Sequence, residues 1–210
     1  MVHPIGRRFF KLVMKPYIGK VRGLENIPKD RNFILAANHD SYMDHLILAT
    51  VFVNRLNKRV HFLAKKELFS QWIKKKFHEW ADAIPIDRQA GGKKALNIAI
   101  QALKKGKIIV IHPEGTRSMD GKLQRAKTGV ARLALAARVP VLPVGLVGTF
   151  EMLPKWKKIP KFKKAKMNIG KLMYFKEFYG KENDKKSIRM VTNQIMNEIA
   201  KLTGEKYKFD

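Results

Sequence analysis

The chain has 210 residues, 45% of them hydrophobic, which is enough material for one domain with a buried core. It contains no cysteine, so a disulfide framework, a thiolate nucleophile and a cysteine-based zinc site are excluded. Lysine and arginine total 44 against 17 acidic residues, and this net charge of +27 favours a polyanionic partner without choosing among nucleic acid, anionic lipid and an acidic carrier.

The N-terminal stretch mixes basic and large apolar side chains. Residues 7–15, RRFFKLVMK, have the composition of a short interfacial helix, although an ordinary surface helix packed on the core has the same pattern. We therefore expect an amphipathic, membrane-associating segment over residues 1–19, followed by one domain over residues 20–210. No apolar stretch approaches the roughly 20 residues that span a bilayer, so we expect peripheral attachment without a transmembrane helix.

Short apolar runs alternate with helical patterns along the rest of the chain. The predicted strands are residues 32–38, 59–65, 83–87, 107–113, 139–148 and 165–175. The predicted helices are residues 44–52, 66–81, 92–106, 128–139 and 184–203. This alternation predicts an α/β fold with a layered, mixed, largely parallel sheet flanked by helices. Because active sites of open α/β sheets follow the carboxyl ends of strands, functional residues are expected in the loops after the predicted strands.

The first such loop carries His39 and Asp44, within AANHDSYMDHLIL. Five residues on a continuous helix turn through about 500°, which would leave the two side chains roughly 140° apart. They can meet only if His39 stays in the loop and Asp44 lies in the first helical turn. SYMD supports that arrangement, with Ser41 as N-cap and an acidic residue at N3. Two interpretations remain: a capped helix with an idle histidine, or a general base oriented by a carboxylate.

The second such loop is HPEGTRS, residues 112–118, directly after a predicted strand. Gly115 permits a close backbone approach, and Thr116, Arg117 and Ser118 place hydrogen-bond donors in a small space. The arginine fork suits a phosphate, although a turn with a surface arginine is also common. Two weaker segments accompany it: AIPIDR, which ends in Arg88, and VPVLPV, which reads mainly as a buried strand.

In this order and spacing, NHDSYMD, AIPIDR, HPEGTRS and VPVLPV resemble the motifs of the glycerolipid acyltransferase family, over roughly residues 20–150. Two positions depart from the family's pattern. His112 stands where an aromatic residue is usual before the proline, and Pro85 stands where a phenylalanine is usual. Neither change removes a functional position, but both reshape the expected pocket.

The resemblance implies an enzyme that transfers a fatty acyl group to the free hydroxyl of 1-acyl-glycerol-3-phosphate, giving phosphatidic acid. The donor would be a thioester of acyl carrier protein or coenzyme A, with no other cofactor and no metal. His39 would be the general base, Asp44 would stabilise its imidazolium form, and no covalent acyl-enzyme would form. The resemblance assigns the phosphate of the acceptor to Arg88, Glu114, Gly115, Thr116 and Arg117.

The basic charge fits an anionic lipid surface and an anionic donor. Aromatic residues beside lysines over residues 66–80, and Trp156 and Phe162 within residues 155–166, suggest contact with the cytoplasmic face of the cell membrane, although aromatics at helical spacing also fit ordinary core packing. Two alternatives stay open. One is a related acyltransferase that uses glycerol-3-phosphate or another lysophospholipid, and the other is a basic nucleic-acid- or membrane-surface-binding protein without catalysis.

Overall fold

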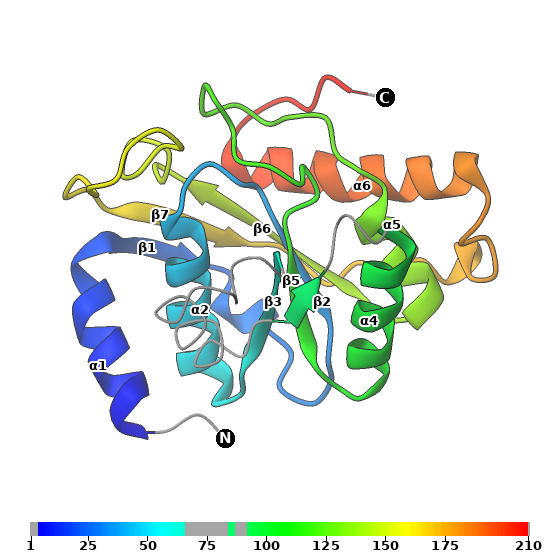
Figure 1. Cartoon of the computed structure of the whole chain (residues 1–210), viewed down its shortest axis with the longest axis horizontal. Helices are drawn as coiled ribbons and strands as arrows, with labels where there is room; N and C mark the ends of the chain where they lie inside the picture. The colour runs from blue at the N-terminus through cyan, green and yellow to red at the C-terminus, as the bar shows by residue number, and fades with distance from the viewer. Residues whose placement is uncertain (1–3, 66–83, 87–91, 210) are drawn as a thin grey trace.

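A seven-stranded sheet organises residues 4–65, 84–86 and 92–209, the part of the chain that the computed structural model describes (Figure 1). Its strand order is β1-β7-β6-β2-β5-β3-β4. The strands are β1 (Ile18–Arg22), β2 (Ile34–Ala37), β3 (Val60–Lys65), β4 (Ile84–Ile86), β5 (Ile108–Ile111), β6 (Val141–Val147) and β7 (Ala165–Ile169). Strands β2 to β6 are parallel, β7 is antiparallel to β6, and β1 is parallel to β7. The predicted α/β fold with a largely parallel sheet is confirmed.

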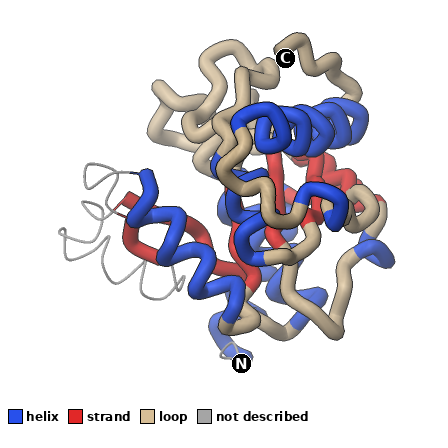
Figure 2. The backbone as a smooth tube through the Cα atoms, turned by 90° about the vertical axis from the view of Figure 1, so that its right-hand side faces the viewer, coloured by secondary structure: helices blue, strands red, loops and turns tan. Residues whose placement is uncertain are grey.

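Helices cover both faces of this sheet, because alternate residues of each buried strand point to opposite sides. Ile34 and Ala36 of β2 join the core under α4, α5 and α6, whereas Leu35 and Ala37 join the core under α1 and α2. The helices are α1 (Pro4–Met14), α2 (Met43–Leu56), α4 (Gly92–Lys104), α5 (Gly129–Ala137) and α6 (Lys185–Thr203). Figure 2 gives the side view, in which α6, near the C-terminus, lies above the strands of the sheet.

The chain reverses its winding direction at β2 and β5, which are neighbours with Ala36 opposite Ile111. Helix α2 leads from β2 to β3 on the far side of β5, and α5 leads from β5 to β6 on the far side of β2. The two helices lie on opposite faces of the sheet. The exits of β2 and β5 are therefore the switch point at which open α/β sheets bind ligands, and both predicted motif loops begin there.

Several element boundaries differ from those predicted. Strand β7 ends at Ile169 and not at residue 175, and pairing with β6 resumes only as a bridge between Met173 and Val141, with the register shifted by one residue. Strand β1 was not predicted at all. The predicted stop of α4 at Gly106 is confirmed, since that residue has φ +79° just past the helix. The predicted helix over residues 66–81 lies outside the described residues.

Helix α1 packs on α2 with one side and leaves apolar side chains on another. Met14 is buried and Phe10 packs against the same core, whereas Leu12 and Val13 are 71% and 48% exposed. The sequence of residues 7–15 allowed either core packing or an apolar outer side. Helix α1 has both. Within the described residues, no helix combines the length and the apolar character that crossing a bilayer requires.

Candidate active site

His39 and Asp44 form a hydrogen-bonded pair at the exit of β2. His39 lies in the loop and Asp44 in the first turn of α2, and 2.9 Å separates Nδ1 of the histidine from Oδ2 of the carboxylate. The Asp44 side chain is fully buried, while that of His39 keeps 12% of its exposure. The pair therefore meets in the only way that the five-residue spacing allows, with a shielded carboxylate behind a ring that reaches the surface.

The start of α2 is built around the same carboxylate. Oδ2 of Asp44 accepts the N–H groups of Asp40 and Ser41, each at 2.8 Å. The regular helix begins at Met43, but Tyr42 already has helical backbone angles (φ −65°, ψ −24°) and its side chain makes no capping bond, so the capping contacts are those predicted for Ser41 and Asp44. The Ser41 hydroxyl still accepts the N–H of Met43 (3.1 Å) and donates to the carbonyl of Leu153. The Asp44 carboxylate thus takes part in capping α2 and also binds the His39 ring.

Two buried carboxyl groups lie within this turn. Burial raises the pKa of Asp44, while the backbone N–H groups of Ser41 and Asp40 and the proximity of the Thr149 hydroxyl oppose that rise. Burial and repulsion from Asp44 raise the pKa of Asp40 to about 7, and the Asn38 side chain, which donates to Asp40 at 2.8 Å, counters part of this. Burial thus disfavours the charged form of both carboxyl groups, and the hydrogen bonds that each accepts act against it.

The second motif loop, residues 112–118, hydrogen-bonds both backbone groups of His39, its N–H and its carbonyl. Oε1 of Glu114 accepts the His39 N–H at 2.8 Å, and the N–H of Ser118 donates to the His39 carbonyl at 2.8 Å. Oε2 of Glu114 accepts the N–H of Gln124 at 2.9 Å. Burial raises the pKa of Glu114 to about 8. Because its two oxygens accept the N–H groups of His39 and Gln124 and the residue is buried, Glu114 braces the His39 loop.

Two cationic side chains, Arg117 and Lys127, lie at the rest of this loop. Gly115 has φ +73°, and a Cβ there would lie 3.1–3.4 Å from the end of the Lys127 side chain, so the lysine runs across the glycine. Thr116 is exposed. The half-buried Arg117 lies with its Cζ 3.4 Å above the centre of the Tyr42 ring. Its Nη1 is buried without a hydrogen-bond partner among the described residues, which leaves this donor for an anion.

A third histidine packs on the pair. The His112 ring stacks on the His39 ring, with centroids 4.0 Å apart and planes inclined by 12°. His45 meets both rings edge-on at 5.1 and 5.0 Å. One nitrogen from each ring lies within 4.8 Å of the others. The sequence placed His45 on a helix and His112 after a strand, but nothing in their spacing predicted this cluster.

Asn38 is a further residue whose role the sequence did not predict. Its side chain exchanges hydrogen bonds with the backbone of Leu146, donating to the carbonyl at 2.9 Å and accepting the N–H at 2.8 Å. The amide thereby extends the β2–β6 pairing by one residue and fixes the point where His39 leaves the sheet. Its place inside the quoted NHDSYMD motif was the available signal.

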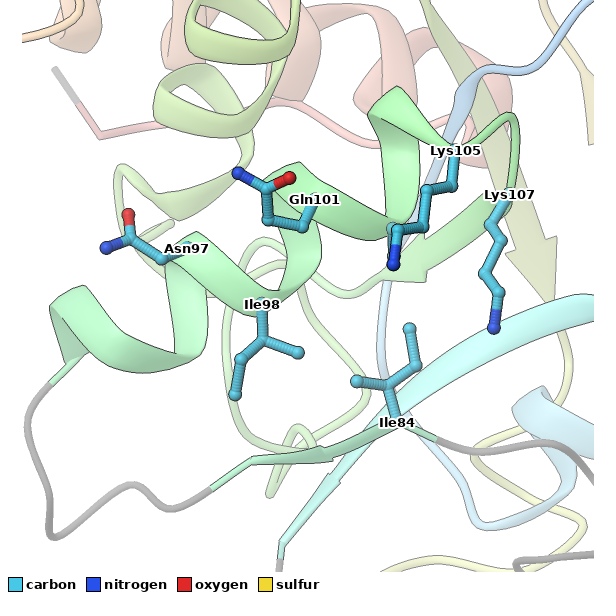
Figure 3. A pocket seen from close by; sticks show the side chains of 7 residues that line it. Ile84, Asn97, Ile98, Gln101, Lys105 and Lys107 are labelled. Atoms are coloured by element: carbon cyan, nitrogen blue, oxygen red, sulfur yellow. The ribbon is translucent and has the colours of Figure 1, made fainter.

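Two features stand apart from this site. Arg88, the predicted phosphate ligand from AIPIDR, lies outside the described residues. A shallow, open groove between α4 and β4 contains Ile84, Asn97, Ile98, Gln101 and two lysines, none of which belongs to the motif loops (Figure 3).

Comparisons with known proteins point to one family. The family model described as "Acyltransferase" matches residues 19–147. The 1-acyl-sn-glycerol-3-phosphate acyltransferase of Bacillus subtilis is 36% identical over 71% of this chain and 70% of its own length. The enzyme of that name from Streptococcus pneumoniae is 30% identical over 86% of this chain, which spans 64% of that relative. The crystal structure of the 1-acyl-sn-glycerophosphate (LPA) acyltransferase PlsC from Thermotoga maritima matches with a TM-score of 0.68 and 31% identity, covering 92% of this chain and 78% of that one.

Proposed function

The chain belongs to the acyltransferase family, and from this premise we propose that it acylates the free hydroxyl of 1-acyl-glycerol-3-phosphate, using an acyl thioester as donor. The relatives' names support this acceptor. One structural observation carries the chemistry: the backbone of His39 is held by Glu114 and Ser118 while its ring is held by Asp44. The two motif loops thus converge on a single histidine.

In the proposed reaction, His39 takes the proton of the acceptor hydroxyl. With Nδ1 bound to Asp44, Nε2 is the nitrogen that receives this proton. The hydroxyl oxygen attacks the thioester carbonyl to give a tetrahedral intermediate. Its collapse expels the thiolate, which recovers the proton from the imidazolium as the new ester forms. The negative charge of Asp44 stabilises the imidazolium in between, and no acyl-enzyme or further cofactor is needed.

The acceptor's phosphate would lie on the cationic side of the second loop. Arg117 offers a buried Nη1 donor, and Lys127 adds a charge across Gly115. Thr116 offers a hydroxyl at the surface, whereas Glu114 would act indirectly by holding the loop. Arg88 stays a predicted member of this site. Because Ser118 is bonded to His39 and directly follows Arg117, a phosphate held there would orient the acceptor relative to the base.

A direct assay tests the proposal. Purified protein is mixed with 1-acyl-glycerol-3-phosphate, glycerol-3-phosphate or lysophosphatidylglycerol, each with a thioester of acyl carrier protein or of coenzyme A, and the products are identified by mass spectrometry. We expect phosphatidic acid from the first acceptor. Turnover of only another acceptor would replace the proposed substrate, and no turnover with any pair would overturn the function.

The same assay tests the phosphate site. Arg117→Ala should raise the KM for the acceptor by roughly 10- to 100-fold, because a charged hydrogen bond to phosphate is lost. The KM for the thioester should not change. Arg22→Ala, which removes an exposed arginine from the edge strand β1, is the matched control. An unchanged acceptor KM would remove Arg117 from the proposed site.

We further propose that the protein binds the cytoplasmic face of the cell membrane through the loop between β6 and β7. Trp156, Ile159 and Phe162 are 55%, 80% and 74% exposed there, among exposed lysines. Phe162 also contacts Tyr17, just after α1, with ring centroids 5.5 Å apart, so the loop adjoins the segment that follows α1. Lysines beside inserted aromatic residues suit an anionic bilayer, at about 1 kcal/mol per charge.

Vesicle co-sedimentation tests this surface. The triple variant Trp156→Ser, Ile159→Ser, Phe162→Ser should bind vesicles that contain phosphatidylglycerol at least about tenfold more weakly than the parent, because burial of large apolar side chains is lost. The control variant Ile98→Ser, Met190→Ser, Phe209→Ser changes three exposed apolar residues elsewhere. Equal binding by both variants and the parent would show that another surface meets the membrane.

A further inference from the structure

We propose that His112 is a positioning residue for the base: its ring stacks on His39 and fixes the direction in which the base presents Nε2. This inference rests on the proposed function, because it assigns a role within the same reaction. It concerns the position at which this chain departs from the usual aromatic residue of its family.

The His112 ring is itself fixed relative to the His39 backbone. Its Nδ1 lies 3.0 and 2.9 Å from the carbonyl oxygens of Ala37 and Asn38, the two residues that precede His39. Because carbonyl oxygens only accept, Nδ1 must carry the ring proton. The His112 ring on which His39 stacks is thus hydrogen-bonded to the end of β2, the strand that leads into His39.

The stack supplies a restraint that Asp44 alone does not. One hydrogen bond fixes the position of Nδ1 of His39 but leaves the ring able to swing about that contact. A neighbouring ring at 4.0 Å, inclined by 12°, blocks this swing on one side, and His45 meets the same ring edge-on. Small misplacements of a reacting group can cost large factors in rate, so the aim of Nε2 affects turnover.

His112 also suits this place electrostatically. The base becomes positively charged during the reaction, so a second charged ring in contact with it would oppose proton transfer. Burial and the proximity of His39 lower the pKa of His112 to about 3. His112 is therefore neutral at any pH at which the enzyme would work, and it acts as an aromatic ring.

The three histidines invite another interpretation, a metal site, because their nitrogens lie within 4.8 Å. The stack argues against it. A metal bound by imidazole lies in the plane of the ring, about 2.0–2.1 Å from the nitrogen. The lone pairs of two nearly parallel rings do not converge on one point, so His39 and His112 cannot bind the same ion as they are arranged.

Two substitutions separate stacking from a purely structural role. His112→Phe keeps a ring and loses both nitrogens, whereas His112→Ala loses the ring as well. We expect His112→Phe to retain kcat within about threefold, and His112→Ala to lose roughly 10- to 100-fold in kcat with both KM values nearly unchanged. Both variants lose the hydrogen bonds to Ala37 and Asn38, so both should melt at lower temperature. Rescue of kcat by phenylalanine is the result that a structural role would not give.

The controls keep the possible failures distinct. Phe209→Ala removes a ring that also packs on another ring, that of Tyr207 at 5.4 Å, and should leave kcat unchanged. An inactive parent enzyme would overturn the proposed function itself. An active parent with His112→Ala equal to it, or with His112→Phe as poor as His112→Ala, would overturn only the positioning role. Calorimetric titration with zinc chloride that gave tight binding, lost in His112→Phe, would assign the rings to a metal instead.

Discussion

Replacing His39 by alanine should reduce kcat/KM by roughly 10²- to 10⁴-fold, the usual contribution of a general base. The variant should fold normally. Its contacts with Glu114 and Ser118 use the backbone N–H and carbonyl of residue 39, which the substitution leaves in place. The loss should therefore appear in steady-state kinetics without a matching fall in melting temperature.

Two additional measurements sharpen this test. Added imidazole should restore part of the activity of His39→Ala, because the gap left beside Asp44 can admit the missing ring. Asn97→Ala, an exposed residue on α4 outside the motif loops, should behave like the parent. If His39→Ala kept most of its activity, the proton would have to leave by another group, and the idle-histidine interpretation would stand.

The sheet could be predicted where strands are buried on both faces. Strands β2, β5 and β6 are almost entirely buried, and they appear in the sequence as unbroken apolar runs. Strand β1 escaped prediction because it is an edge strand, partly exposed, with charges in IGKVR. The end of β7 escaped because it depends on a shift in its pairing with β6, which resumes at Met173 opposite Val141 and is a tertiary feature.

The site could likewise be predicted where its contacts join residues close together in the sequence, and not where they join distant ones. The contact of His39 with Asp44 spans five residues, so helix geometry alone restricted it to one arrangement. The brace from Glu114 and the stack with His112 join residues more than 70 positions apart in the chain. No local pattern states which atoms will meet over that separation. The resemblance assigned Glu114 to the acceptor's phosphate, and no local pattern indicated that its oxygens accept the N–H groups of His39 and Gln124.

The second large effect is expected at Asp44, and it separates charge from scaffolding. Oδ2 of Asp44 accepts three N–H groups, from His39, Asp40 and Ser41. In Asp44→Asn, the amide oxygen can accept the same three donors. The new NH₂ group would replace the buried Oδ1, with the hydroxyl of Thr149, which already lowers the pKa of Asp44, as its acceptor. The loop should therefore keep its shape while the negative charge behind the imidazole is lost.

We expect Asp44→Asn to lose at least about 10²-fold in kcat, since the imidazolium is no longer stabilised. Its stability should equal or exceed that of the parent, because burial already disfavours the carboxylate, as the raised pKa of Asp44 indicates. Asp44→Ala should instead lose about 2–6 kcal/mol of unfolding free energy in urea, since the N–H groups of Asp40 and Ser41 lose their acceptor. If Asp44→Asn were as active as the parent, the carboxylate would serve only to start α2. An inactive but stable Asp44→Asn would show that a group that starts the helix also carries the charge for catalysis.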